Sequence, residues 1–158
     1  MEIGEVSVRH QWKTVQLSGL RQFQHPVVIA GPPTRDGYDP CVVRIRSVTS
    51  DSAGKKYGFS AAIQEEEARK NSGHATETIG YLAVSTTTEL ALHQILCKNF
   101  FVTVASGYDT QVAVEEEKSK DSETNHINET VGVLFLNDQV FANMQTFNGS
   151  DTASMRRK

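Results

Sequence analysis

The sequence predicts an all-β protein: an antiparallel β-sandwich of about six strands, with a second partial or permuted copy. Three observations lead to this prediction. Short runs of alternating apolar residues dominate the chain, turn signals separate these runs, and two sequence segments each occur twice. With 158 residues, the chain is long enough to bury one good core or two small ones.

Six runs of alternating apolar residues are the predicted strands. In chain order they cover residues 6–10, 14–17, 27–30, 42–48, 59–63 and 78–84. Alternation in the fourth run places Ile45 on one face and both Arg44 and Arg46 on the other. The first face is expected in the core, and the arginine face in water. The predicted core residues are Phe23, Val28, Ile45, Phe59, Ile63 and Leu82.

Two further segments are assigned from their turn chemistry and periodicity. Pro32 and Pro33 cannot sit inside a central strand, and residues 35–40 contain Asp-Gly and a proline, so this segment is predicted to be an exposed loop. Residues 86–96 contain the one helix signal, because several leucine and isoleucine residues could share a face. So short a run is equally compatible with a strand.

The repeats occur in a changed order. Segment 74–82 returns as 126–134 with a shared His-x-x-Glu-Thr motif, and segment 28–39 returns as 140–151. In the first copy the Asp-Gly segment precedes the His-x-x-Glu segment, whereas near the C-terminus its Asn-Gly counterpart follows it. The predicted units are a module at 4–84, a linker or degraded repeat segment at 85–106 and a partial or permuted second copy at 107–158.

Composition and charge exclude several classes of partner. The net charge of −3 gives no basic stripe of the kind that nucleic-acid binders use, so no nucleic-acid partner is expected. No apolar run approaches the length of a membrane span, which needs about 20 residues. Cys41 and Cys97 could pair, but two cysteines are far from a disulfide scaffold and leave the compartment open.

The His-x-x-Glu motif invites a metal or acid/base interpretation. An imidazole and a carboxylate such as His74 and Glu77 can ligate zinc or transfer protons. An i, i+3 pair on a strand points to opposite faces, however, and no third ligand type recurs, so a structural or turn-capping role is favoured and ligand contact is the alternative. No nucleophile elbow or phosphate-binding loop is present, and we expect no enzymatic activity.

Three glutamates precede each His-x-x-Glu motif, at 65–67 and at 115–117. Their carboxylates could bind calcium, although solvated charge at a strand edge is the stronger interpretation. No cofactor is therefore expected, and Ca²⁺ is the alternative for the glutamate triplets. Trp12 is either an anchor of the core or a platform on which a sugar could stack.

A set of motifs in the first half of the chain resembles the H-type lectin domain, a β-sandwich that binds galactose and N-acetylgalactosamine. These motifs are Trp12-x-x-Val15, Phe23-x-x-Pro26, Arg44-Ile-Arg46, Gly58-Phe59 and Thr78-Ile-Gly-Tyr81. The resemblance covers residues 6–84 and, in part, 107–158. It implies six antiparallel strands, often a homotrimer, and sugar bound between subunits. In that family an aromatic–histidine pair contacts sugar where this chain has its first glutamate triplet, which favours neutral sugars or a bridging cation here.

Two functions follow as hypotheses. The first is a non-catalytic carbohydrate-binding module for neutral galactose-type glycans, within a homo-oligomer such as a trimer. The second is a structural or adhesion repeat that binds no small ligand. The chain is expected outside the cell or at the cell surface, although its first residues have no signal-peptide pattern. The changed repeat order suggests a fragment or a rearranged version of a larger repeat array. The candidate sugar contacts are Arg44, Arg46, Glu65, Glu67, His74 and Glu77.

Overall fold

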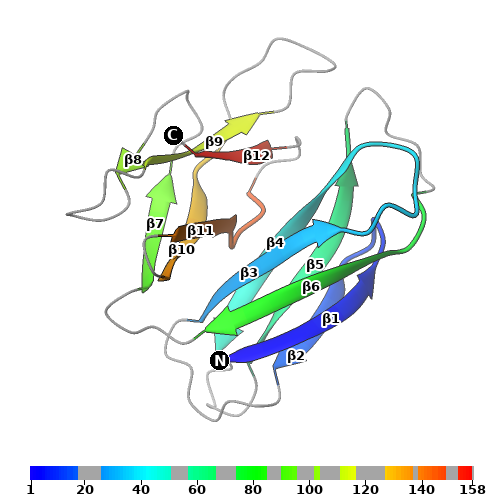
Figure 1. Cartoon of the computed structure of the whole chain (residues 1–158), viewed down its shortest axis with the longest axis horizontal. Coiled ribbons are helices and arrows are strands. Elements are labelled where there is room, and N and C mark those ends of the chain that lie inside the picture. The colour runs from blue at the N-terminus through cyan, green and yellow to red at the C-terminus, as the bar shows by residue number, and fades with distance from the viewer. Residues whose placement is uncertain are drawn as a thin grey trace.

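The computed structural model describes residues 1–17, 26–50, 57–66, 74–84, 90–95, 102–103, 111–116, 127–136, 139–148 and 153–157. Within these ranges every regular element is a β-strand, and every strand pair is antiparallel (Figure 1). The predicted all-β fold class is therefore confirmed. The described part of the chain contains no helix with the length and apolar character needed to cross a membrane.

The first six strands form two three-stranded sheets, which we call the first module. The sheets have the strand orders β1-β6-β3 and β2-β5-β4 and lie face to face (Figure 1). The alternating sequence produces this arrangement, because each strand turns one row of apolar side chains toward the other sheet. The strands are β1 (Glu2–Val8), β2 (Lys13–Leu17), β3 (Val27–Pro33), β4 (Cys41–Ser50), β5 (Tyr57–Glu65) and β6 (Glu77–Val84).

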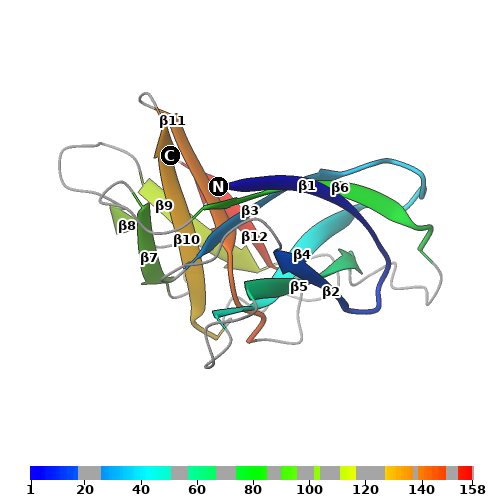
Figure 2. The ribbon, with the colours of Figure 1, turned by 90° about the horizontal axis from the view of Figure 1, so that it is seen from below.

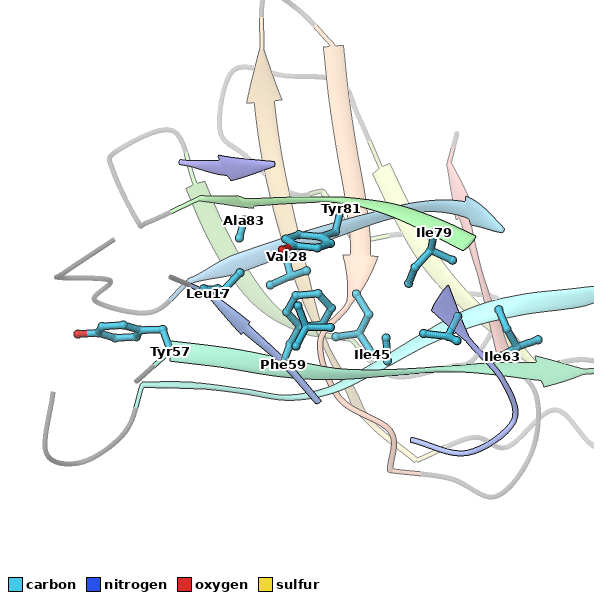
Figure 3. Close-up of a cluster of buried hydrophobic side chains, with 12 residues drawn as sticks. Leu17, Val28, Ile45, Tyr57, Phe59, Ile63, Ile79, Tyr81 and Ala83 are labelled. Carbon is cyan, nitrogen blue, oxygen red and sulfur yellow. The ribbon is translucent and has the colours of Figure 1, made fainter. Parts of the chain in front are cut away.

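The core of the first module lies between these sheets (Figure 3). Phe59 is at its centre, with 1% of its surface exposed and its ring 5.1 Å from that of Tyr81 in an edge-to-face contact. The prediction was wrong for Leu82, which is half-buried on the outer face, because the alternation of β6 turns Ile79 and Tyr81 inward. Phe23 lies outside the described residues. The confirmed core residues are Val28, Ile45, Phe59 and Ile63.

The arginine face of β4 is less exposed than predicted, because Arg46 and Val48 are half-buried and Arg44 is buried. Arg44 is 1% exposed, not in water, because Glu129 from the second half of the chain lies against it. A β-bulge then interrupts the pairing of β4 with β5 between Arg46 and Thr49, and Ser47 adopts a left-handed backbone conformation with φ 54°. The inserted residue shifts the alternation, so Val48 packs against the core.

The two prolines are in a strand, not in the predicted loop. β3 continues to Pro33, with a register shift between Ala30 and Pro33. This is compatible with proline because β3 is an edge strand of its sheet, where a missing N–H need not break a ladder. The exposed loop therefore begins at Thr34 and ends before β4.

The last six strands form two further sheets, which we call the second module. Their orders are β11-β10-β7 and β12-β9-β8. Residues 90–95, within the segment that carried the helix signal, are a strand. The second module lies beside the first, with β10 and β11 against β3 (Figures 1 and 2). Its strands are β7 (Leu90–Ile95), β8 (Val102–Thr103), β9 (Gln111–Glu116), β10 (Glu129–Leu136), β11 (Gln139–Met144) and β12 (Ala153–Arg157).

The second module repeats the strand pairing of the first in a different chain order. In the two sheets, β7, β8, β9, β10, β11 and β12 take the places of β1, β2, β5, β6, β3 and β4. Segment 85–106 thus contributes β7 and β8, the counterparts of β1 and β2. The registers agree at matching pairs: Val8↔Glu77 matches Ile95↔Glu129, Ile29↔Leu82 matches Phe141↔Leu134, and Arg44↔Ala62 matches Arg156↔Ala113. The register shift of β3 between Ala30 and Pro33 does not recur in β11.

Candidate functional site: a loop anchored by a buried carboxylate

The loop between β3 and β4 is held by the side chain of Glu77, the first residue of β6. This carboxylate is fully buried. Its Oε2 accepts hydrogen bonds from the Thr34 hydroxyl at 2.6 Å and from the Asp36 N–H at 3.1 Å, and its Oε1 accepts one from the Gly37 N–H at 2.8 Å. Charged acceptors form the stronger class of hydrogen bonds, so one side chain fixes the first half of the loop.

Thr34 also ties the loop to the backbone of β6. Its hydroxyl oxygen accepts a hydrogen bond from the Thr78 N–H at 2.8 Å, and its own N–H donates to the Thr78 carbonyl at 2.9 Å. The Glu-Thr pair at the start of β6 therefore fixes the loop in two ways. Glu77 accepts hydrogen bonds from the loop, and the backbone of Thr78 binds Thr34, the residue at which the loop begins.

His74 supports the same loop from below. Its Nδ1 lies 3.1 Å from the carbonyl oxygen of Ala75, and its Nε2 lies 3.2 Å from that of Asp39. Carbonyl oxygens only accept, so both contacts are hydrogen bonds when both ring nitrogens carry a proton, as in the imidazolium. Nδ1 is 3.5 Å from Glu77 Oε1, with both side chains almost completely buried. The expectation that this i, i+3 pair points to opposite faces was wrong, because residues 74–76 precede the strand.

The protonation of this pair follows from its surroundings. Burial alone lowers the pKa of His74, but the hydrogen bonds to Ala75 and Asp39 and the charges of Glu65 and Glu77 raise it above its ordinary value. Burial alone raises the pKa of Glu77, but the loop's hydrogen bonds and the His74 charge lower it below its ordinary value. Both shifts favour the ionised pair.

Gly37 is required where the loop crosses the histidine. A Cβ atom at this position would collide with the imidazole ring of His74. The Asp-Gly signal in the sequence therefore marks a close approach between the loop and the side chain beneath it.

The anchored loop presents Tyr38 to solvent. This side chain is 102% exposed, whereas Phe141, another exposed aromatic residue, is 39% exposed. Arg35 and Asp36 are also exposed on the loop. A bulky aromatic ring thus projects from a backbone that Glu77 and His74 fix from below.

The second module contains the same anchor. Glu129, the counterpart of Glu77, accepts hydrogen bonds from the Thr146 hydroxyl and from the Asn148 N–H, the latter at 3.1 Å to Oε1. The Thr130 N–H donates to the Thr146 hydroxyl at 2.8 Å, as Thr78 does to Thr34. Among the described residues, Arg44 of the first module places a cation beside Glu129, with Nη2 3.2 Å from Oε1, as His74 does beside Glu77. His126, the sequence counterpart of His74, lies outside the described residues.

The second loop is packed against the first module. Phe147 lies beneath the Arg44 guanidinium, 4.7 Å from its ring centroid, and meets the ring of Trp12 edge to face at 5.2 Å. The Arg46 guanidinium covers Trp12 at 4.1 Å. Trp12 is half-buried at this junction between modules and is not among the core cluster of the first module. The two loops therefore differ in their surroundings. Tyr38 of the first loop faces solvent, whereas Phe147 of the second packs at the junction between the modules.

Of the remaining candidate residues, Arg44 and Arg46 lie together at the junction of Trp12 and Phe147, and the charge of Glu65 acts on His74. Glu65, at the end of β5, is 7% exposed and pairs in register with Cys41, which is a free thiol. Glu67 and Cys97 lie outside the described residues. Among the side chains that the structure describes, no group of three or more His, Cys, Asp or Glu residues could hold a metal ion. The sequence did not single out Tyr38 or Thr34 as candidate residues. The available signal is that the segment containing them and the His-x-x-Glu segment recur together, which indicates that the two segments are in contact.

Comparisons with protein-family models, with curated proteins and with solved structures give no match for this chain.

Proposed function

We propose that the chain is a non-catalytic carbohydrate-binding module that recognises neutral galactose-type glycans through the loop at residues 34–40. The observation that carries this proposal is the wholly exposed Tyr38 ring on a loop held by the buried Glu77 carboxylate. The apolar C–H face of a sugar can stack on such a ring, as aromatic side chains combine apolar area with low conformational entropy.

The anchor makes this loop a favourable place for a ligand. A loop that is already ordered loses little entropy on binding, so more of the contact energy appears as affinity. Exposed Arg35 supplies hydrogen-bond donors and Asp36 supplies acceptors for sugar hydroxyls. His74 and Glu77 act as positioning residues beneath the loop, in place of direct sugar contacts.

A non-catalytic role agrees with the positions of the Glu77 and Glu129 carboxylates, which are buried and hold loops. Glycoside hydrolysis needs two carboxyl groups that reach the scissile bond. Glu77 and Glu129 are fully buried and accept hydrogen bonds from their own loops, which leaves neither of them access to a substrate. The exposed loop offers contacts for binding, in an extracellular or cell-surface setting.

The test is glycan binding by matched tyrosine variants. Tyr38→Ala should weaken binding to a galactose- or N-acetylgalactosamine-terminated glycan at least about tenfold, or about 1.4 kcal/mol, while Tyr38→Phe retains most of it. Both should melt near the wild-type temperature because this ring makes no core contact. Ile127→Ala, which also truncates an exposed side chain, is the control and should bind normally.

Two further experiments test whether a bridging calcium ion and whether the first glutamate triplet take part in glycan binding. Titration with calcium and with a chelator tests a bridging cation, and Glu65→Gln with Glu67→Gln should weaken binding if that triplet takes part. Equal glycan affinity in wild type and Tyr38→Ala would contradict the loop site. Absence of binding to any neutral glycan, with or without calcium, would contradict the carbohydrate-binding proposal and favour a structural or adhesion repeat.

The second candidate function is a structural or adhesion repeat, and one observation favours it. The loop of the second module is used to join modules, through Phe147 between Arg44 and Trp12. A chain whose loops serve as connectors needs no small ligand. Homo-oligomer formation, expected from the lectin resemblance, belongs equally to both functions.

A further inference from the structure

The outer face of one sheet in the second module is covered by an edge of the first module. Gly132 of β10 is buried there, and a Cβ atom at this position would lie 2.6 Å from Val27 Cγ1 of β3. Leu134, two residues along the same face, is only 4% exposed. The glycine therefore forms a recess that receives the edge strand β3.

Side-chain amides hold this edge in place. The Val28 N–H donates to Gln145 Oε1 at 2.8 Å, and Gln145 Nε2 donates to the Val28 carbonyl at 2.7 Å. Asn143 Nδ2 donates to the Ala30 carbonyl at 3.4 Å. The amide of Gln145 thus gives the exposed backbone of β3 the two hydrogen bonds that a neighbouring strand would give.

The first module has the same face, but it is open. Gly80 and Leu82 of β6 are the register counterparts of Gly132 and Leu134. Gly80 is exposed, and within the described part of the chain no atom lies within 4 Å of a Cβ atom built on it. Beside it, Ile3, Leu82 and Ile29 pair directly across β1, β6 and β3 and form an apolar row, in which Ile3 is 73% exposed. We call Gly80 with this row the open socket.

We infer that the open socket binds the edge strand β11 of a second copy of this chain. β11 is the counterpart of β3, and it stands at the edge of its own sheet. Each chain thus offers one open socket and one such edge, and the contact between modules inside the chain supplies the template for joining them. Because the two surfaces differ, the association is head to tail. It is independent of glycan binding.

The contact between chains lacks one part of the internal contact. Gly31 aligns with Asn143, and Gln145 aligns with Pro33 in the repeated sequence and with Thr34 in backbone pairing, so no side-chain amide stands at these places in the first module. The pair of amides that holds β3 therefore has no counterpart at the open socket. Apolar contact must therefore carry the association. We expect it to be weaker than the internal contact and to depend on protein concentration.

The first test uses Gly80→Glu in sedimentation experiments over a range of concentrations. The new side chain enters open space in the single chain, so folding is retained, which circular dichroism checks. Gln16→Glu adds the same charge to the outer face of the other sheet and is the control. Wild type and Gln16→Glu should associate equally, and Gly80→Glu at least about tenfold more weakly. A monomeric wild type, or equal association of all three proteins, would overturn the proposal.

The second test defines which surfaces meet. Gln139 of β11 is the counterpart of Val27, which enters the recess at Gly132. In a Cys41→Ser, Cys97→Ser background, Gly80→Cys and Gln139→Cys proteins should form a disulfide-linked dimer when they are mixed and oxidised, and little when each is oxidised alone. Efficient linking of Gly80→Cys to itself would indicate a two-fold, face-to-face dimer and would contradict the head-to-tail arrangement.

Discussion

Replacement of Arg44 by methionine should destabilise the protein by about 3–5 kcal/mol, the usual effect of removing one partner from a buried ion pair. The Arg44 and Glu129 side chains are both 0% exposed, and their charged atoms lie 3.2 Å apart. Methionine fills much of the same volume but leaves the Glu129 charge buried without this guanidinium. It also removes the cation above the Phe147 ring, a contact of roughly 0.5–2 kcal/mol.

Urea unfolding gives the size of this effect, and the only tryptophan of the chain reports on its location. Trp12 touches Phe147 at the junction between modules, so its fluorescence should shift in Arg44→Met before global unfolding. Adding Glu129→Gln should restore part of the lost stability, because the buried carboxylate charge is removed together with the guanidinium that faced it. A loss below about 1 kcal/mol for Arg44→Met, typical of surface ion pairs, would refute the buried junction.

Three further predictions concern the anchor, the bulge and the core. The pKa of His74 is raised in the folded protein, so the stability that His74 contributes is complete below its ordinary pKa of 6.5 and is lost as pH rises through the folded pKa. The pKa of Glu77 is lowered, so the stability that Glu77 contributes is complete above its ordinary pKa of 4.5 and is lost as pH falls through the folded pKa. The unfolding free energy should therefore fall on both sides of pH 4.5–6.5, and His74→Gln should remove the loss on the alkaline side. Ser47→Gly should raise stability by about 1 kcal/mol, because glycine adopts φ 54° without a Cβ clash; an unchanged or lower melting temperature would contradict this. Phe59→Ala should cost about 3–5 kcal/mol in chemical denaturation, since the ring is 1% exposed, and a cost near zero would place it outside the core.

The sequence predicted the strands better than their faces. Alternation correctly placed Val28, Ile45 and Phe59 in the core, because each of these strands has one clear apolar row. It misplaced Leu82, because both rows of β6 contain apolar residues and only the structure shows which row faces the other sheet. The burial of Arg44 could not be predicted from the sequence either, because its partner Glu129 is 85 residues away in the chain.

The candidate site was only partly predictable for a related reason. The repeated His-x-x-Glu-Thr motif directed attention to His74 and Glu77, and a structural or turn-capping role was the favoured interpretation. The donors that Glu77 accepts lie about 40 residues earlier, at Asp36 and Gly37. No local rule joins segments so far apart. Their joint recurrence in both halves of the chain was the available signal, because segments that touch are repeated together.

Glu77→Gln tests most directly whether the anchored loop is the glycan-binding element. The glutamine side chain keeps the shape but replaces an acceptor oxygen with a donor amide, which opposes the N–H groups of Asp36 and Gly37. Calorimetric titration with an N-acetylgalactosamine-terminated glycan should show affinity at least about tenfold weaker, together with faster hydrogen exchange at the Gly37 amide. Wild-type affinity in a variant whose Gly37 amide exchanges freely would contradict the dependence of binding on this loop.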